Sequence, residues 1–120
     1  MERVRFVSHN EKWILLHDFS NCDSREFATA LKQATTMIGS QAGVSHLVLV
    51  DVTGLRIDPE IIGAAKTYIE NSKDYVRAVA VVGLTGFQES MFTYAVAATK
   101  KQIASFRDLA EAKAWLIEKN

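Results

Sequence analysis

Residues 46–62, with the sequence HLVLVDVTGLRIDPEII, decide the fold. The stretch begins as an unbroken apolar run that is too short to cross a membrane and is rich in β-branched residues. Such a run predicts a strand that is buried on both faces of a sheet. A polar loop and a helix start follow, because Asp58 is a good N-cap, Pro59 suits the first helical position and Glu60 meets the positive end of the helix dipole. The stretch therefore predicts half of a β-α-β unit, in which function usually lies at the loop after the strand.

The rest of the chain alternates strands and helices around this unit. Two apolar runs around a polar turn predict a β-hairpin, and three capping boxes mark helix starts. This order predicts an α/β fold: a mixed, mostly parallel sheet of about five strands with four helices. The predicted strands are 4–8, 12–19, 46–52, 76–82 and the edge strand 102–106. The first predicted helix is capped by Asp23 and ended by residues 39–43, and the second runs from Asp58 to about Asn71. The third begins at Thr85 and ends at Lys100 and Lys101, and the fourth begins at Asp108.

Apolar residues at helical spacing predict the side of each helix that faces the core. The third predicted helix is unusually bulky, and its aromatic residues do not share one narrow stripe. We favour a core role for its large side chains, with contact to a partner or a lipid-like ligand as the alternative. The predicted inward-facing residues are Phe27, Ala30, Leu31, Ala34, Met37 and Ile38; Ile61, Ile62, Ala65 and Ile69; and Leu109, Ala112, Trp115 and Leu116, and the bulky set is Phe87, Met91, Phe92 and Tyr94.

Length and charge narrow the class of protein. A chain of 120 residues without a linker or repeat predicts one domain over residues 1–120. Fourteen basic and fourteen acidic residues cancel, which argues against nucleic acid as a main partner. Zero net charge also favours association, so we expect a homo-oligomer, most simply a two-fold dimer.

Cysteine usage and the N-terminus point to the cytoplasm. Cys22 is the only cysteine, which excludes an intrachain disulfide and a cysteine metal cluster and fits a reducing compartment. Residues 1–6 carry no apolar core of a signal peptide, and no segment is long and apolar enough to be a transmembrane helix. We therefore expect a cytoplasmic protein.

No pattern in the chain indicates an enzyme, a cofactor or a metal. His9, His17 and His46 lack helical i, i+4 spacing, and nothing marks Cys22 as an activated thiol. The turn at residues 83–86 joins a strand to a helix but lacks the lysine and third glycine of phosphate-binding loops, which favours a tight turn over an anion site. We therefore expect no catalytic, cofactor or metal site.

Asp51 is the one candidate for acid–base chemistry, because it ends a buried strand. A carboxyl in that position either has a raised pKa and transfers protons, or accepts hydrogen bonds from loop amides. We favour the second, structural role.

Three stretches together resemble the STAS domain, the fold of bacterial anti-anti-sigma factors, and especially its small stand-alone members. The element order and nearly the whole chain share the likeness. The resemblance implies an α/β fold and a protein-interaction role rather than catalysis. The three stretches are LVDVTGLRID at residues 49–58, AVAVVGLTG at residues 78–86 and IASFRDLAEAKAWL at residues 103–116.

One departure from the family pattern concerns regulation. In the signalling members, the aspartate that matches Asp58 is followed by Ser-Ser-Gly, and a serine there is phosphorylated to switch partner binding. Here Pro59, Glu60 and Ile61 follow, so no hydroxyl stands at that point. A single carboxylate lacks the second charge and third oxygen of a phosphate. We expect no phosphorylation in this loop and do not assign the phosphosite to the earlier Thr53.

We therefore expect a non-enzymatic interaction module, with a carrier of a small apolar ligand or lipid as the alternative and an enzyme of unknown class as the third. The working surface is expected where two helix N-termini follow the parallel strands, with Leu55, Arg56 and Phe87 exposed. The guanidinium of Arg56 suits a carboxylate or phosphate of a partner. The predicted surface comprises Thr53, Leu55, Arg56, Ile57, Asp58, Glu60, Thr85, Gly86 and Phe87.

Overall fold

The structure is a computed structural model that describes residues 2–39, 45–97 and 102–119. The predicted helix endings at residues 40–43 and at Lys100 and Lys101 lie outside these residues, as do the side chains of Met91, Phe92 and Tyr94. The elements are β1 (Val4–His9), β2 (Lys12–Asp18), α1 (Ser24–Gly39), β3 (His46–Asp51), α2 (Pro59–Ser72), a 3-10 turn (Lys73–Tyr75), β4 (Val76–Val82), α3 (Gly86–Ala97), β5 (Gln102–Phe106) and α4 (Leu109–Ile117).

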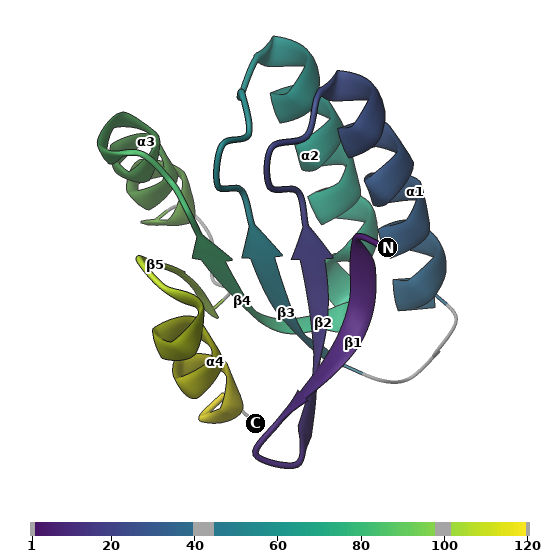
Figure 1. Ribbon diagram of the computed structural model, residues 1–120, viewed down its shortest axis with the longest axis vertical. Coiled ribbons are helices and arrows are strands. Elements are labelled where there is room, and N and C mark those ends of the chain that lie inside the picture. Colours follow the sequence, from purple (N-terminus) through teal and green to yellow (C-terminus); the bar gives the residue numbers. More distant parts are fainter. Residues whose placement is uncertain (1, 40–44, 98–101, 120) are drawn as a thin grey trace.

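The strands form one five-stranded sheet in the order β1-β2-β3-β4-β5. β1 and β2 are antiparallel, and the other neighbouring pairs are parallel. Helices α1 and α2 lie side by side on one face of the sheet, and α4 covers β3 to β5 on the other face (Figure 1). The predicted fold class and order of elements are confirmed.

Each face of the sheet has its own apolar core. Burial on both sides explains why β3 is an unbroken apolar run rather than an alternating one. The core under α1 and α2 is the larger and is built around Val4, Leu15, Phe19, Phe27, Ala30, Ala34, Ile38, Val52, Leu55, Ile61 and Val81, whereas the core under α4 contains Ile14, Leu47, Leu49, Ala78, Ala80, Val82, Ala112 and Leu116.

Two predicted inward-facing residues of α2 are wrong, because Ile62 is 37% exposed and Ile69 is 59% exposed. The helix instead docks through Ile61, which packs into the core, and through Tyr68, which hydrogen-bonds to the sheet. Helical spacing is compatible with an inward face that contains either Ile62 and Ile69 or Ile61 and Tyr68. A choice based on apolarity alone favours the isoleucines over the tyrosine. Leu109, at the first turn of α4, is likewise 42% exposed rather than core.

The hydrogen bond of Tyr68 reaches His17, which is completely buried in β2. Nδ1 of His17 lies 3.3 Å from the carbonyl of Leu15, so it carries the ring proton. Nε2 is therefore free to accept from the Tyr68 hydroxyl at 2.6 Å. Burial lowers the pKa of His17 to about 4, which keeps the ring neutral between the sheet and α2.

This pairing predicts an acid-sensitive contribution to stability. The pKa of His17 is lower in the folded state than the usual 6.5, so its contribution is complete above pH 6.5 and falls as the pH drops toward 4. The free energy of unfolding, measured by urea denaturation, should therefore fall by about 2–3 kcal/mol between pH 7 and pH 4.5 because of this one group. The control is His17→Leu, which should show a smaller loss over the same interval. Identical pH profiles for the two proteins would contradict the role of His17.

The hairpin between β1 and β2 turns on two residues with positive φ, Asn10 at 49° and Glu11 at 67°. His9 and Lys12 pair on either side, so this is the two-residue loop that matches strand twist. Asparagine tolerates that backbone conformation, but glutamate does so at a steric cost.

Glu11→Gly should therefore raise the free energy of unfolding by about 1 kcal/mol. Glu11→Ala is the matched control, since it removes the carboxylate and keeps Cβ, and it should give no gain. Chemical denaturation measures both, and equal effects of the two substitutions would show that charge rather than backbone strain is responsible.

Candidate functional site

The predicted working surface lies where the parallel strands end, and strand-terminal aspartates organise it. Asp18 of β2 and Asp51 of β3 are neighbours in the sheet register. The carboxylate of Asp18 accepts the amide of Ser20 at 3.1 Å, and that of Asp51 accepts the amide of Thr53 at 3.0 Å. The structural role expected for Asp51 is confirmed, and it shapes the loop from β3 to α2.

Backbone hydrogen bonds hold successive loops together beyond the ends of their strands. The amide of Phe19 donates to the carbonyl of Asp51 at 2.9 Å, and the amide of Asn21 donates to the carbonyl of Thr53 at 2.8 Å. On the other side, the amide of Val52 donates to the carbonyl of Val82 at 2.9 Å. The loops after β2, β3 and β4 therefore lie side by side as a continuation of the sheet.

Two glycines with positive φ allow this close stacking. A Cβ on Gly83, whose φ is 96°, would lie 2.6 Å from the amide nitrogen of Thr53 and would also overlap its hydroxyl. A Cβ on Gly54, whose φ is 72°, would lie 3.0 Å from Cγ of Asn21 and would overlap its side-chain oxygen. The loops after β3 and β4 thus meet at Thr53 and Gly83.

Gly83→Ala should destabilise the protein by about 2 kcal/mol or more, because it adds strain and a clash with main-chain atoms of Thr53 that no rotamer relieves. The matched control is Gly86→Ala, where an added Cβ meets nothing within 4 Å. That change should stay within about 0.5 kcal/mol. Thermal or urea unfolding compares the two, and equal losses would contradict the stacking of these loops.

The helix start after the β3 loop is built as predicted, with one correction. The carboxylate of Asp58 caps α2 by accepting the amide of Ile61 at 2.9 Å. Leu55, expected on the surface, is only 6% exposed and belongs to the core under α1 and α2. Ile57 is half-buried against the same core. The loop turns inward at Leu55 because burying this apolar side chain is more favourable than exposing it to water.

The exposed polar members of the predicted surface are Thr53, Arg56, Glu60 and Thr85. Arg56 makes no hydrogen bond or ion pair with the described residues. The amide and hydroxyl of Thr85 are already hydrogen-bonded in a capping box with Gln88. The amide of Thr85 donates to the Gln88 side-chain oxygen at 3.0 Å, and the amide of Gln88 donates to the Thr85 hydroxyl at 3.4 Å. Arg56 is therefore the charged group on this surface with its donors available.

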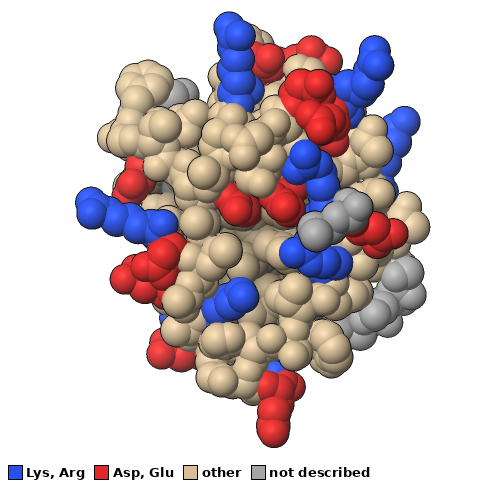
Figure 2. Space-filling model, in the orientation of Figure 1, with Lys and Arg blue, Asp and Glu red and all other residues tan. Residues whose placement is uncertain are grey.

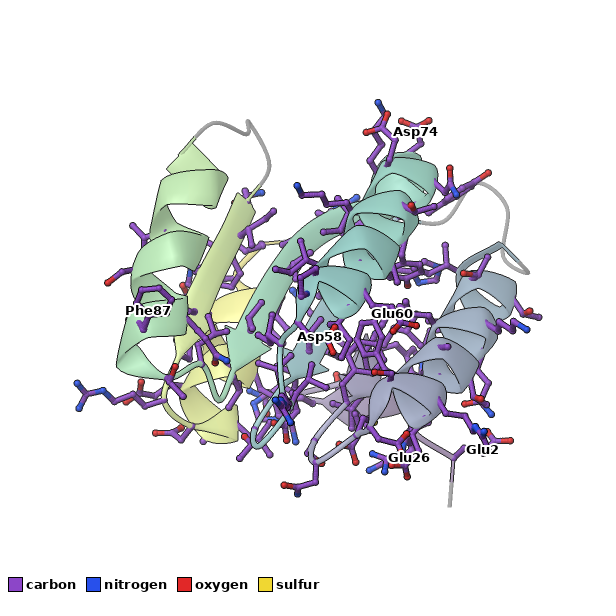
Figure 3. The ribbon with its side chains drawn as sticks, turned by 90° about the horizontal axis from the view of Figure 1, so that it is seen from above. Glu2, Glu26, Asp58, Glu60, Asp74 and Phe87 are labelled. Atoms are coloured by element: carbon purple, nitrogen blue, oxygen red, sulfur yellow. The ribbon has the colours of Figure 1, made fainter. Side chains whose placement is uncertain are left out.

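Phe87 is the most exposed large apolar residue of the described chain, at 78%. The core role favoured for the bulky residues of this helix is therefore wrong for Phe87, because its position in the first turn of α3 faces solvent. Viewed from above, its ring lies on α3, well apart from Asp58 and Glu60 at the start of α2 (Figure 3). The loops that precede the two helices touch, but the helix starts do not converge on one point. The predicted surface is thus two adjoining parts: the α2 start with Arg56 and Glu60, and the α3 start with Phe87.

Burial holds the side chains of Cys22 and His46 in their neutral forms. Burial raises the pKa of the Cys22 thiol, which keeps it in the unreactive protonated form. Burial also lowers the pKa of His46, which keeps its ring neutral. No group of three potential metal ligands is found among residues 2–39, 45–97 and 102–119.

Charges of both signs are interspersed over the face drawn in Figure 2, and none forms a large block of one sign. This distribution agrees with the balanced composition of the sequence. No helix in the described part of the chain has the length and hydropathy needed to cross a membrane.

Sequence reasoning missed that the loop after β2 belongs to this surface. A likeness between two short loop sequences could have revealed it: residues 18–22 are DFSNC and residues 51–55 are DVTGL. Each has an aspartate, an apolar residue, a hydroxyl residue, a residue with positive φ and a buried residue, and Figure 1 shows the same bend after β2 and β3. Asn21, with φ of 56°, stands where the second loop has Gly54.

Comparison with known proteins identifies the fold. No protein-family model and no curated protein matches the chain significantly. Among solved structures, it is similar to an uncharacterised protein of the DUF3478 family with a SpoIIAA-like fold from Shewanella loihica, with a TM-score of 0.75, 15% identity, and coverage of 94% of this chain and 91% of that one.

It is also similar to an anti-sigma-factor antagonist (STAS) domain protein from Planctomyces limnophilus, with a TM-score of 0.65, 11% identity, and coverage of 95% of this chain and 97% of that one. The chain therefore has the STAS-like fold that its sequence resembles, and at these identities the likeness concerns the fold alone.

Proposed function

We propose that this chain is a non-enzymatic, cytoplasmic protein–protein interaction module with a regulatory role. The observation that carries the proposal is the pair of unused groups beside the stacked loops: the free guanidinium of Arg56 and the ring of Phe87, which is 78% exposed. Exposed aromatic and arginine side chains are the residues that contribute most at protein interfaces. The STAS-like fold is compatible with such a role, since one structural neighbour is an anti-sigma-factor antagonist domain protein.

The manner of regulation differs in this proposal from a phosphorylation switch. Pro59 and Glu60 open α2 without a hydroxyl, and the side chain of Thr53 packs against Gly83. Partner binding would then be set by the fixed charges of Arg56 and Glu60. A two-fold dimer, expected from the zero net charge, stays a prediction.

Carriage of an apolar ligand receives no comparable support. A groove of about 340 Å³ between β1 and α1 is lined by Glu2, Val4, Lys32, Gln33, Thr36 and Met37. Its lining surface is mostly apolar, but the groove is open to solvent rather than enclosed. A site for a small apolar ligand normally buries most of the ligand's surface.

The test is to compare proteins captured from host lysate by the parent chain and by Arg56→Ala and Phe87→Ala. Both side chains are exposed, so each change should leave the free energy of unfolding within about 0.5 kcal/mol. We expect each to lose a partner that the parent binds, as measured by quantitative mass spectrometry.

The matched controls remove the same kinds of side chain elsewhere. Arg25→Ala removes an exposed arginine of α1, and Trp13→Ala removes a ring that is 66% exposed near the start of β2, at the opposite end of the strands. Both controls should keep every partner. If Arg56→Ala and Phe87→Ala also keep every partner, the interaction surface lies elsewhere and the assignment is wrong.

A further inference from the structure

β1 is the open edge of the sheet. It pairs with β2 on one side and with no described strand on the other. α1 packs against one face of β1, whereas the opposite edge strand, β5, has both α3 and α4 packed against it. β1 pairs with β2 over six consecutive residues without a register shift, and its sequence, VRFVSH, contains neither proline nor lysine and one charged residue, Arg5. A regular edge without proline or a bulge is available for pairing with another chain.

The hydrogen-bond register shows which main-chain groups of β1 face outward. The amide of Asp18 donates to the carbonyl of Arg3 at 2.7 Å, so Arg3 points its main chain toward β2. In an antiparallel pair the direction alternates, so Arg5 and Val7 also bond to β2. The N–H and C=O groups of the intervening residues, Val4, Phe6 and Ser8, therefore face away from the sheet.

A groove beside this edge limits what can pair there. α1 lies over and beyond the edge of β1 (Figure 1). The groove of about 340 Å³ is lined by Glu2 and Val4 and, from α1, by Lys32, Gln33, Thr36 and Met37. Pairing β1 with β1 of a second copy about a two-fold axis normal to the sheet would bring both α1 helices to the same face, over the paired strands. A single extended segment meets no such obstacle.

We propose that the β1 edge binds an extended peptide segment of a partner protein, which adds to the sheet as a further strand beneath α1. Main-chain hydrogen bonds to Val4, Phe6 and Ser8 supply the affinity. Arg5 is half-buried on the face opposite α1, and its guanidinium donates to the carbonyl of Glu2 at 3.0 Å. On the α1 face, Lys32 and Glu2 both line the groove and carry opposite charges, so the charge that selects the segment is that of Arg5. A segment with an acidic residue opposite Arg5 therefore fits best, since opposite charges on adjacent strands attract.

This inference rests on the proposed function only in taking the partner to be a protein. The binding surface is different: it is the β1 edge rather than the carboxyl-end surface with Arg56 and Phe87. Arg56→Ala and Phe87→Ala should bind such a segment as the parent does. A failure of the carboxyl-end surface therefore leaves the β1 site standing, and a failure at β1 leaves the carboxyl-end surface standing.

The experiment is amide hydrogen exchange by NMR on the full chain. The probe is a blocked eight-residue peptide of alternating threonine and valine with one central glutamate. Without peptide, the amides of Val4, Phe6 and Ser8 should exchange rapidly and those of Arg5 and Val7 slowly. The peptide should slow the first set at least tenfold, and its lysine counterpart should bind about two- to fivefold more weakly.

A substitution pair tests the main-chain contact directly. Ser8→Pro removes an outward N–H and no bond to β2, so the fold should persist while peptide binding weakens at least tenfold. Ser8→Ala keeps the N–H and should bind within twofold of the parent. The proposal is overturned if millimolar peptide slows none of the three amides, or if they become protected without peptide as protein concentration rises, which would identify a second copy as the occupant.

Discussion

The close stacking of the loops at the carboxyl ends of β2, β3 and β4 is the constraint on which the candidate site depends. Asp18 and Asp51 turn the chain at equivalent points, and main-chain bonds then join each loop to the next. The stacking requires a residue without Cβ at Gly83, since main-chain atoms of Thr53 occupy that space. The stacking also fixes the position of Arg56 in its loop and the point at which α3 begins. The exposed side chains of the site therefore project from loops that are joined to one another rather than from independent loops.

Most of the fold follows from short-range patterns in the sequence. An unbroken apolar run identifies β3, alternation of strands and helices indicates a parallel sheet, and the capping residues Asp23, Asp58 and Asp108 place helix starts correctly. The errors arise where two faces of one element compete. On α2, apolarity favours Ile62 and Ile69, but the helix turns Tyr68 inward because His17 offers a buried acceptor. That acceptor lies 51 positions away in the sequence, beyond the reach of any local pattern.

The sequence predicted only part of the candidate site, because some of its features are local and others depend on tertiary packing. Cap geometry and the exposure of Arg56 follow from residue type and position in the loop. The burial of Leu55 and the separation of Phe87 from Asp58 depend on how the loop packs on the core and on where α3 lies, which are tertiary properties. The STAS-like fold explains the framework, whereas the proposed role depends on side chains particular to this sequence, including Pro59 and Glu60 at the start of α2.

Amide hydrogen exchange at Phe19, Asn21 and Val52, whose N–H groups join one loop or strand end to the next, tests most directly whether the loops form a rigid surface before a partner binds. If the loops continue the sheet, these three amides exchange as slowly as those inside β3 and far more slowly than an exposed turn. Exchange of all three at the rate of an unstructured peptide would show that the loops move independently and that the surface is not preformed.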